Sequence, residues 1–257
     1  MMPIDKAQVA QRFAKAHQSY DLHAVVQKRI CRHLMNLMLQ ILPERNFKRV
    51  LEIGCGSGNL SHQLLQRLRI ERLILNDLYP EIQQHFKAAE NLEWLIGDIE
   101  QLAFPQALDL AVSSSALQWM ADLKSVFRQA HQALQPCGYF CFSTFGRQNL
   151  QEIKALTGQG LEYLTPAEIQ HLLQQQGFEV LYLSESLDAL HFNHPREVLQ
   201  HLKATGVTAV SAGQRWTKQS LAQFYQGYAQ YSQRNDAGQP EYHLSYHPIY
   251  CIARRTS

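Results

Sequence analysis

The stretch Val50-Leu51-Glu52-Ile53-Gly54-Cys55-Gly56-Ser57-Gly58-Asn59-Leu60 decides the fold. It opens with a short apolar run, 49–53, of the length that a buried parallel strand needs. Three glycines follow at alternate positions, and helical spacing of apolar residues begins at Leu60. Glycine allows positive φ and close approach of the backbone to a ligand, and the start of a helix offers unpaired N–H groups. A strand, a glycine turn and a helix in this order predict a cradle for a nucleotide-containing ligand.

The spacing of the glycines narrows the class of ligand. Dinucleotide-binding folds use Gly-x-Gly-x-x-Gly, with pyrophosphate at the helix N-terminus. Here Gly54, Gly56 and Gly58 give Gly-x-Gly-x-Gly, preceded by Glu52. This pattern resembles the first motif of Rossmann-like methyltransferases that use S-adenosylmethionine. Their cofactor has no phosphate, so the loop only has to make room for its methionine half. A glycine-rich turn in another α/β protein remains the alternative for this stretch alone.

Length and composition bound the possibilities. The 257 residues fit one α/β domain with an insertion or a small lid, and 46% hydrophobic residues suffice for a full core. The formal net charge of +2 provides no strong field, which argues against nucleic acid as a partner. The five cysteines form no C-x-x-C pair, and we interpret them as free thiols in a reducing cytoplasm. No long apolar stretch opens the chain, so we expect neither a signal peptide nor a membrane span.

A second motif follows the glycine turn. We expect a strand over 72–77 that ends in Asp77, 19 residues after Gly58. An acidic residue about 20 residues on, at the end of the second strand, accepts hydrogen bonds from ribose hydroxyls. The alternative is a helix N-cap, because Leu78-Tyr79-Pro80 and a helix expected from Glu81 come next. The spacing favours the ribose.

A third motif, Gly97-Asp98-Ile99-Glu100, follows a short strand expected over 94–96. In the methyltransferases that this chain resembles, the aspartate binds the adenine amino group and the next backbone N–H reaches a ring nitrogen. A carboxylate suits an amino group because it only accepts hydrogen bonds. The resemblance therefore implies Asp98 and Ile99 as cofactor contacts, and Leu78 and Ser115 beside them.

The loop Ser114-Ser115-Ala116-Leu117-Gln118-Trp119 follows a fourth strand, expected over 108–113. Open parallel sheets bind ligands at the carboxyl ends of their strands, so we expect this loop to face the transferred methyl group. It lacks the Asn/Asp-Pro-Pro-Tyr pattern with which amino-group methylases grip a flipped DNA base. That difference argues against a nucleic-acid base as the substrate.

The expected fold is α/β: a Rossmann-like, seven-stranded, mostly parallel sheet with helices on both faces. The remaining expected elements are helices over 1–20, 24–41, 123–134, 166–176 (with Thr165 and Glu168 as a capping box), 195–204 and 218–231, a turn at 136–138, and strands over 139–144, 178–183 and 244–253. We expect one methyltransferase domain, 1–257, composed of an N-terminal helical lid (1–46), a Rossmann-like core (47–190), a helical insertion that lids the substrate (191–240) and a final strand (241–257).

Six further features narrow the resemblance. They are Tyr20-x-x-His23-Ala24-x-x-Gln27, Gly97-Asp98-Ile99-Glu100, Ala116-Leu117-Gln118-Trp119, Phe142-Ser143-Thr144-Phe145-Gly146 with Asn149-Leu150, His201-Leu202-Lys203-Ala204-Thr205-Gly206, and Leu244-Ser245-Tyr246-His247 with Ile249-Tyr250. Together they resemble the malonyl-[acyl-carrier protein] O-methyltransferase family of biotin synthesis, over nearly the whole chain. The lysine segment and the final Tyr-His are the most specific. One departure is Arg147, where many relatives have proline or another residue.

The resemblance implies methyl transfer from S-adenosylmethionine to the free carboxylate of malonyl-acyl-carrier protein or malonyl-coenzyme A. The product is the methyl ester that primes pimeloyl synthesis. The carboxylate is ionised at neutral pH, since carboxyls titrate at about 4, so we expect no catalytic general base and no metal. The side chains expected to position the carboxylate are Lys203, His247, Tyr20, Tyr246, Gln118 and Trp119.

The carrier protein is expected to be acidic. The basic residues in the segments predicted to border the substrate mouth are Arg147, Lys154, Arg196, Lys203, Arg215 and Lys218. Two other functions stay open at this point: a methyltransferase for another small metabolite such as a quinone precursor, and a non-catalytic protein that binds S-adenosylmethionine. The unbroken cofactor motifs argue against the second.

Overall fold

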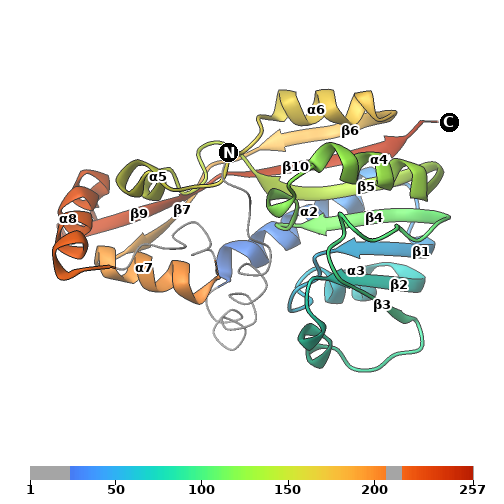
Figure 1. Ribbon diagram of the computed structural model, residues 1–257, viewed down its shortest axis with the longest axis horizontal. Helices are drawn as coiled ribbons and strands as arrows, with labels where there is room; N and C mark the ends of the chain where they lie inside the picture. The colour runs from blue at the N-terminus through green and yellow to red at the C-terminus, as the bar shows by residue number, and fades with distance from the viewer. Residues whose placement is uncertain (1–23, 207–215, 257) are drawn as a thin grey trace.

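A computed structural model gives the structure of the chain and describes residues 24–206 and 216–256. Seven strands of this described part form the central sheet, in the order β3-β2-β1-β4-β5-β10-β6 (Figure 1). Their bounds are β1 Asn46–Ile53, β2 Arg69–Asp77, β3 Leu92–Ile96, β4 Leu108–Ser114, β5 Leu134–Phe145, β6 Phe178–Glu185 and β10 Pro248–Arg255. The neighbouring strands are parallel in the pairs β3–β2, β2–β1, β1–β4 and β4–β5. Strand β10 runs antiparallel to both β5 and β6. The predicted seven-stranded, mostly parallel sheet is confirmed.

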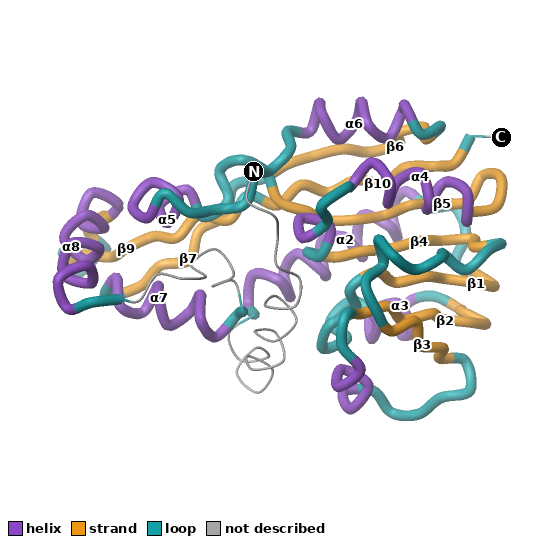
Figure 2. Tube along the Cα trace, viewed as in Figure 1, coloured by secondary structure: helices purple, strands orange, loops and turns teal. Residues whose placement is uncertain are grey.

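Helices cover both faces of this sheet (Figure 2). Because side chains alternate along a strand, Val50 packs in one hydrophobic cluster and Leu51 in the other. On the first face lie α2 (Val25–Ile41) and α3 (Ser61–Arg67); on the second lie α4 (Leu123–Ala133) and α6 (Pro166–Gln175). The capping box of α6 is confirmed, since Thr165 Oγ1 accepts from Glu168 N and Glu168 Oε2 accepts from Thr165 N.

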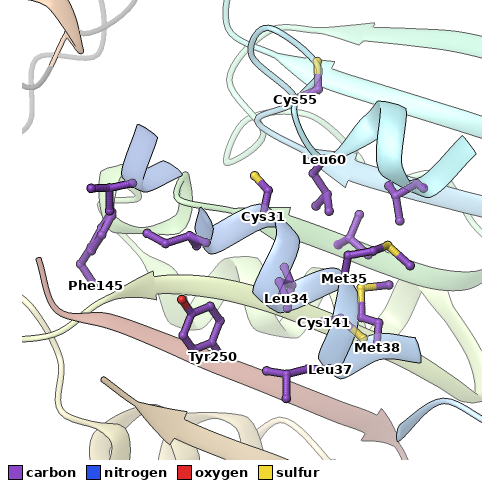
Figure 3. Packing of buried hydrophobic residues seen from close by; sticks show 14 of the residues in the cluster. Cys31, Leu34, Met35, Leu37, Met38, Cys55, Leu60, Cys141, Phe145 and Tyr250 are labelled. Atoms are coloured by element: carbon purple, nitrogen blue, oxygen red, sulfur yellow. The ribbon is translucent and has the colours of Figure 1, made fainter. Parts of the chain in front are cut away.

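The helix α2 belongs to the core. Its residues Leu34, Met35 and Met38 are buried against the sheet, near Cys141 and Tyr250 (Figure 3). The predicted helix over 24–41 is therefore confirmed, but this part of the expected lid is a packed layer of the domain. The first expected helix, 1–20, lies outside the described residues.

An extension projects from one end of the central sheet (Figure 1). It contains a three-stranded antiparallel sheet in the order β7-β9-β8 and the helices α5, α7 and α8. The bounds are α5 Gln151–Thr157, β7 Asp188–Phe192, α7 Pro195–Ala204, α8 Lys218–Tyr228, β8 Ser232–Arg234 and β9 Pro240–Tyr246; short 3₁₀ helices are η1 Pro80–His85, η2 Leu117–Trp119 and η4 Ala229–Tyr231. The helical patterns over 195–204 and 218–231 are confirmed, and the small sheet was not predicted.

Two predicted boundaries were wrong. The single last strand over 244–253 is two strands, β9 and β10, which belong to different sheets and meet at His247. Apolar residues continue through this junction, so the pattern could not show that the strand changes sheets. The expected turn at 136–138 is a bulge inside β5: Cys137 has φ +64°, and the register jumps from Leu108–Leu134 to Leu110–Tyr139.

The prediction that the cysteines are free thiols is confirmed. All five cysteines are free thiols, and four of them are buried. Among the described residues, no helix combines the length and the apolar character needed to cross a membrane.

A buried carboxylate fastens the extension together. Glu152 on α5 is fully buried, and its two oxygens accept hydrogen bonds from the backbone N and the Oγ of Ser245 on β9. His243 Nε2 lies 3.4 Å from Glu152 Oε1. The backbone N of Leu150 donates to Ser245 O at 2.9 Å. These bonds fix the start of α5 against β9.

Replacing Glu152 tests this link. Glu152→Ala leaves the buried N–H and O–H of Ser245 unpaired, and we expect a loss of roughly 3–5 kcal/mol of unfolding free energy, from two hydrogen bonds to a charged group. Glu152→Gln keeps an oxygen for the N–H and an NH₂ for the hydroxyl, so its loss should be much smaller. Chemical denaturation measures both, with exposed Glu162→Ala as the control. Equal losses for the two Glu152 variants would contradict the assignment.

Candidate functional site

A first cavity lies at the carboxyl ends of β1, β2 and β4, where the strand order reverses. In the register of the sheet, Ile53 stands opposite Asn76 on one side and Ser113 on the other, so the three strands end together. The lining residues are Gln27, Cys31, Glu52, Gly54, Cys55, Gly56, Ser57, Asn59, Leu60, Asn76, Asp77, Leu78, Tyr79, His85, Gly97, Asp98, Ile99, Ser114, Ser115, Ala116, Trp119 and Met120. This set contains all the residues predicted to bind the cofactor except Gly58.

The three glycines of the turn have different reasons to be glycine. A Cβ on Gly54 would stand 2.4 Å from the Cβ of Ala116, so Gly54 allows the loop after β4 to approach. Gly56 has φ +52° and nothing within 4 Å of its Cβ position, which leaves room beside the cavity. Gly58 has φ +85°, and a Cβ there would meet the ring of Phe86 at 2.9 Å. Gly58 thus shapes the turn from outside the cavity.

Asp77 ties the end of β2 to the glycine turn. Its Oδ2 accepts from Gly56 N at 2.8 Å, and its Oδ1 accepts from Leu78 N at 2.7 Å. Burial raises the pKa of this carboxyl, and the hydrogen bond from Gly56 N opposes the rise. The N-cap alternative is wrong, because η1 begins at Pro80 and its N-cap is Tyr79. A contact between Asp77 and ribose stays a prediction.

The loop that carries Asp98 is held by its acidic neighbour. Asp98 Oδ1 accepts from Glu100 N at 3.0 Å. The Glu100 carboxylate in turn accepts from Ala121 N at 3.0 Å and Asp122 N at 2.6 Å. The Gly-Asp-Ile-Glu motif therefore links the end of β3 to the loop after η2, and both segments border the first cavity.

The lining of the first cavity is acidic. Glu52, Asp77 and Asp98 are on it, and none of the described residues that line it is Lys or Arg. Glu52 is 1% exposed, and its Oε2 has no hydrogen-bond partner among the described residues. Burial raises the pKa of Glu52 to about 8, and the charge of Asp77 adds to the rise. A site of this kind favours a cationic ligand, whose charge would stabilise the ionised Glu52.

A second cavity opens beside the first. Its lining residues are Gln27, Ser115, Gln118, Trp119, Phe145, Asn149, Leu150, Leu161, Tyr163, Thr205 and Tyr246. Gln27, Ser115 and Trp119 line both cavities, so these three residues mark the junction. Gln118, Trp119 and Tyr246, which the sequence singled out for the substrate, are here together.

Buried polar atoms gather at the junction. Gln27 Oε1, Ser115 Oγ and Gln118 Oε1 have no hydrogen-bond partner among the described residues. Ser115 has φ +54°, an uncommon conformation for a residue with a side chain. Its backbone N–H lies 3.2 Å from Ser143 Oγ and 3.1 Å from Ser143 O. Polar groups at this depth are expected to meet a polar ligand.

Two residues predicted to position the substrate line neither cavity. His247 is buried, its Nδ1 accepts from Gln148 N at 3.1 Å, and its Nε2 lies 2.9 Å from Glu185 Oε2. Both ring nitrogens are occupied, so we assign His247 to the junction of β9 and β10. Lys203 is exposed on α7. Tyr20 and His23 lie outside the described residues.

Two of the basic residues expected to meet the carrier protein form ion pairs within the chain. Arg147 Nη2 pairs with Glu168 at 2.9 Å, and Lys154 Nζ lies 3.8 Å from Glu162. Arg215 lies outside the described residues.

Asn149, Tyr163 and Thr205 line the second cavity and were not predicted to do so. Asn149 belongs to a segment that carries the family resemblance, but that resemblance implies no contact for it. Tyr163 lies in an irregular loop before α6, where no periodicity or spacing points to a site.

Comparison of the sequence with known proteins finds methyltransferases among its relatives. A methyltransferase-domain model matches residues 23–183. The malonyl-[acyl-carrier protein] O-methyltransferase of Acinetobacter baylyi is 49% identical over 99% of this chain and 98% of its own length. The protein of the same name from Haemophilus ducreyi is 39% identical, covering 97% of this chain and 96% of its own.

Solved structures agree in fold. A methyltransferase-like protein of Bacillus halodurans superimposes with a TM-score of 0.63 at 15% identity, covering 87% of this chain and 99% of its own. The N-methyltransferase NodS of Bradyrhizobium japonicum, solved with S-adenosyl-L-homocysteine, gives 0.53 at 14% identity, covering 88% and 87%. At these identities the likeness concerns the fold alone.

The buried Glu52 predicts a pH-dependent stability. In the unfolded chain Glu52 ionises near its ordinary pKa of 4.5, whereas the folded chain keeps it protonated up to about pH 8. Stability is therefore lost as pH rises between these values, at about 1.4 kcal/mol per pH unit. Glu52→Gln removes this cost, so its gain in Tm over the wild type should be larger at pH 8 than at pH 5.

Scanning calorimetry of the ligand-free protein at both pH values measures the difference, with exposed Glu162→Gln as the control. A gain that does not change with pH would show that Glu52 is ionised in the folded protein.

Proposed function

This chain belongs to the malonyl-[acyl-carrier protein] O-methyltransferase family, and on that premise we propose that it transfers the methyl group of S-adenosylmethionine to the free carboxylate of malonyl-acyl-carrier protein. The observation that carries the proposal is the pair of joined cavities, one acidic and one neutral, which meet at Gln27, Ser115 and Trp119. The methyl ester so formed is the primer for pimeloyl synthesis in the biotin pathway.

The first cavity suits S-adenosylmethionine, which supplies an electrophilic sulfonium methyl group when bound. The fit rests on the carboxylates of the lining, on the unpartnered Oε2 of Glu52 and on the open space beside Gly56. Asp77 would accept from the ribose hydroxyls. Asp98 and the backbone N–H of Ile99 would bind the adenine.

The second cavity would hold the malonyl carboxylate. One carboxylate oxygen forms the new bond to the methyl carbon while the bond from that carbon to sulfur breaks, and no proton moves. The malonyl carboxylate is ionised at neutral pH, so the chain need not supply a base. Its residues instead align the reactants and exclude water, a contribution that reaches about 7–11 kcal/mol when alignment is ideal.

The acyl group would arrive from the side of the extension. Lys203 is exposed on α7, and Arg196 and Lys218 stand on α7 and α8. We propose that these cations meet the acidic carrier protein, which speeds encounter and fixes orientation. Malonyl-coenzyme A lacks that protein surface and would use only the inner site.

Mass spectrometry of the acyl group tests the function directly. We expect the purified protein with S-adenosylmethionine to add one methyl group to malonyl-acyl-carrier protein. Acetyl-acyl-carrier protein, which has no free carboxylate, should gain none, and neither should a phenolic quinone precursor. Methylation of the phenol but not of the malonyl group would replace this proposal with a quinone-type methyltransferase.

Lys203→Ala tests the carrier contact. Because Lys203 is exposed, we expect a rim interaction of about 0–1 kcal/mol, and thus a rise of up to about fivefold in KM for malonyl-acyl-carrier protein. Activity on malonyl-coenzyme A should stay near normal, and the difference should shrink as salt rises, because salt screens exposed charges.

Steady-state kinetics on both thioesters at two ionic strengths measures this, with exposed Lys124→Ala on α4 as the control. A loss above tenfold on both thioesters would instead place Lys203 beside the malonyl carboxylate.

A further inference from the structure

The hydrogen-bond direction of Asn149 can be assigned. Asn149 is 5% exposed, and its Oδ1 accepts from the backbone N of His247 at 3.3 Å. A backbone N–H can only donate, so the amide oxygen faces His247 and the NH₂ group faces the other way. On that side Asn149 Nδ2 donates to the hydroxyl oxygen of Tyr163 at 2.9 Å.

This assignment fixes the role of the Tyr163 hydroxyl. Its oxygen accepts from Asn149, so its own hydrogen must point elsewhere. Among the described residues, nothing else bonds to this hydroxyl, and Tyr163 lines the second cavity. Burial raises the pKa of Tyr163 to about 12, so the hydrogen is present at neutral pH. Tyr163 is therefore a donor prepared for a ligand.

The loop that carries Tyr163 is fastened at a second point. Arg147 Nε donates to the Tyr163 carbonyl at 3.4 Å, and its Nη2 contacts both oxygens of Glu168 at 2.9 and 3.0 Å. Glu168 closes the capping box with Thr165 at the start of α6. The ring of Tyr163 is thus held from its backbone and from its hydroxyl.

In the proposed function the second cavity binds an anion, and the described part of its wall carries no cation. None of the described residues that line it is Lys, Arg or His. Among the described lining residues, a carboxylate would therefore meet only neutral donors, and hydrogen bonds to an ionised acceptor are roughly twice as strong as neutral ones. A carboxylate has two oxygens: a donor on one of them leaves the other free to attack.

We propose that Tyr163 donates its hydroxyl hydrogen to the malonyl carboxylate oxygen that does not receive the methyl group, and that Asn149 positions Tyr163 for this contact. The proposal rests on the proposed function and adds the residue that recognises the accepting group. Asn149 does not touch the substrate in this scheme; it determines where the hydrogen of Tyr163 points.

Tyr163→Phe removes the hydroxyl and keeps the ring. We expect kcat/KM for the malonyl thioester to fall at least tenfold, mainly through KM. The Kd for S-adenosylmethionine should stay within twofold of wild type, because Tyr163 does not line the first cavity. Tyr182→Phe on β6, outside both cavities, is the matched control. Wild-type kinetics in Tyr163→Phe would overturn the proposal.

Asn149→Asp separates positioning from a merely structural role. The new carboxylate can still accept from His247 N, but it also accepts from Tyr163 and turns the hydroxyl hydrogen away from the cavity. We expect a loss in kcat/KM like that of Tyr163→Phe. The double variant should be no worse than Tyr163→Phe within twofold. Additive losses would show that residue 149 acts without the hydroxyl, for example through charge repulsion, and would overturn the positioning role.

Circular dichroism and the Kd for S-adenosylmethionine confirm that each variant is folded. The mass-spectrometric assay of the wild type distinguishes a failure of the proposed function from a failure of this inference. If the wild type does not methylate malonyl-acyl-carrier protein, the proposed function fails; if it does and Tyr163→Phe is unimpaired, only this inference fails.

Discussion

The rest of the site depends on the two hydrogen bonds of Asp77. One carboxylate oxygen accepts from Gly56 in the turn after β1, and the other accepts from Leu78 after β2. Beyond the end of β1, the backbone bond from Cys55 N to Asn76 O at 2.9 Å still joins the turn to β2. Asp77 adds a side-chain link at a depth where an unpaired carboxylate would be costly. The glycine turn, the end of β2 and the acidic wall of the first cavity therefore share Asp77 as a support.

The sequence predicted the first cavity well because its parts are local. Gly54 and Gly56 come shortly after a predicted strand, Asp77 ends the next one and Asp98 comes shortly after the third, and parallel strands bring their carboxyl ends to one edge. The second cavity is different. Tyr163, Thr205 and Tyr246 come from an irregular loop, the end of α7 and β9, and only tertiary packing brings them together.

The misassigned His247 shows the same limit. A polar histidine beside a tyrosine in a predicted strand is the kind of side chain that often lines a polar pocket. Whether its ring points into a cavity depends on Gln148 and Glu185, which are far away in the sequence. At His247 the chain also passes from β9 in the small sheet to β10 in the central sheet without a change in hydrophobic pattern. No single-sequence signal distinguishes these arrangements.

The first cavity has an acidic lining, whereas the described lining of the second cavity is neutral. This difference bears on how Glu52 responds to the reaction. In the proposed reaction a sulfonium and a carboxylate become a thioether and an ester, so one positive and one negative charge disappear together. Glu52 is a carboxyl whose burial raises its pKa to about 8, and its ionisation is favoured only beside a cation. Product formation removes the sulfonium charge and leaves the α-ammonium of the cofactor. If Glu52 faces the sulfonium, as a cofactor contact of this kind would require, the spent cofactor would bind less tightly than the methyl donor, and product inhibition would be weaker.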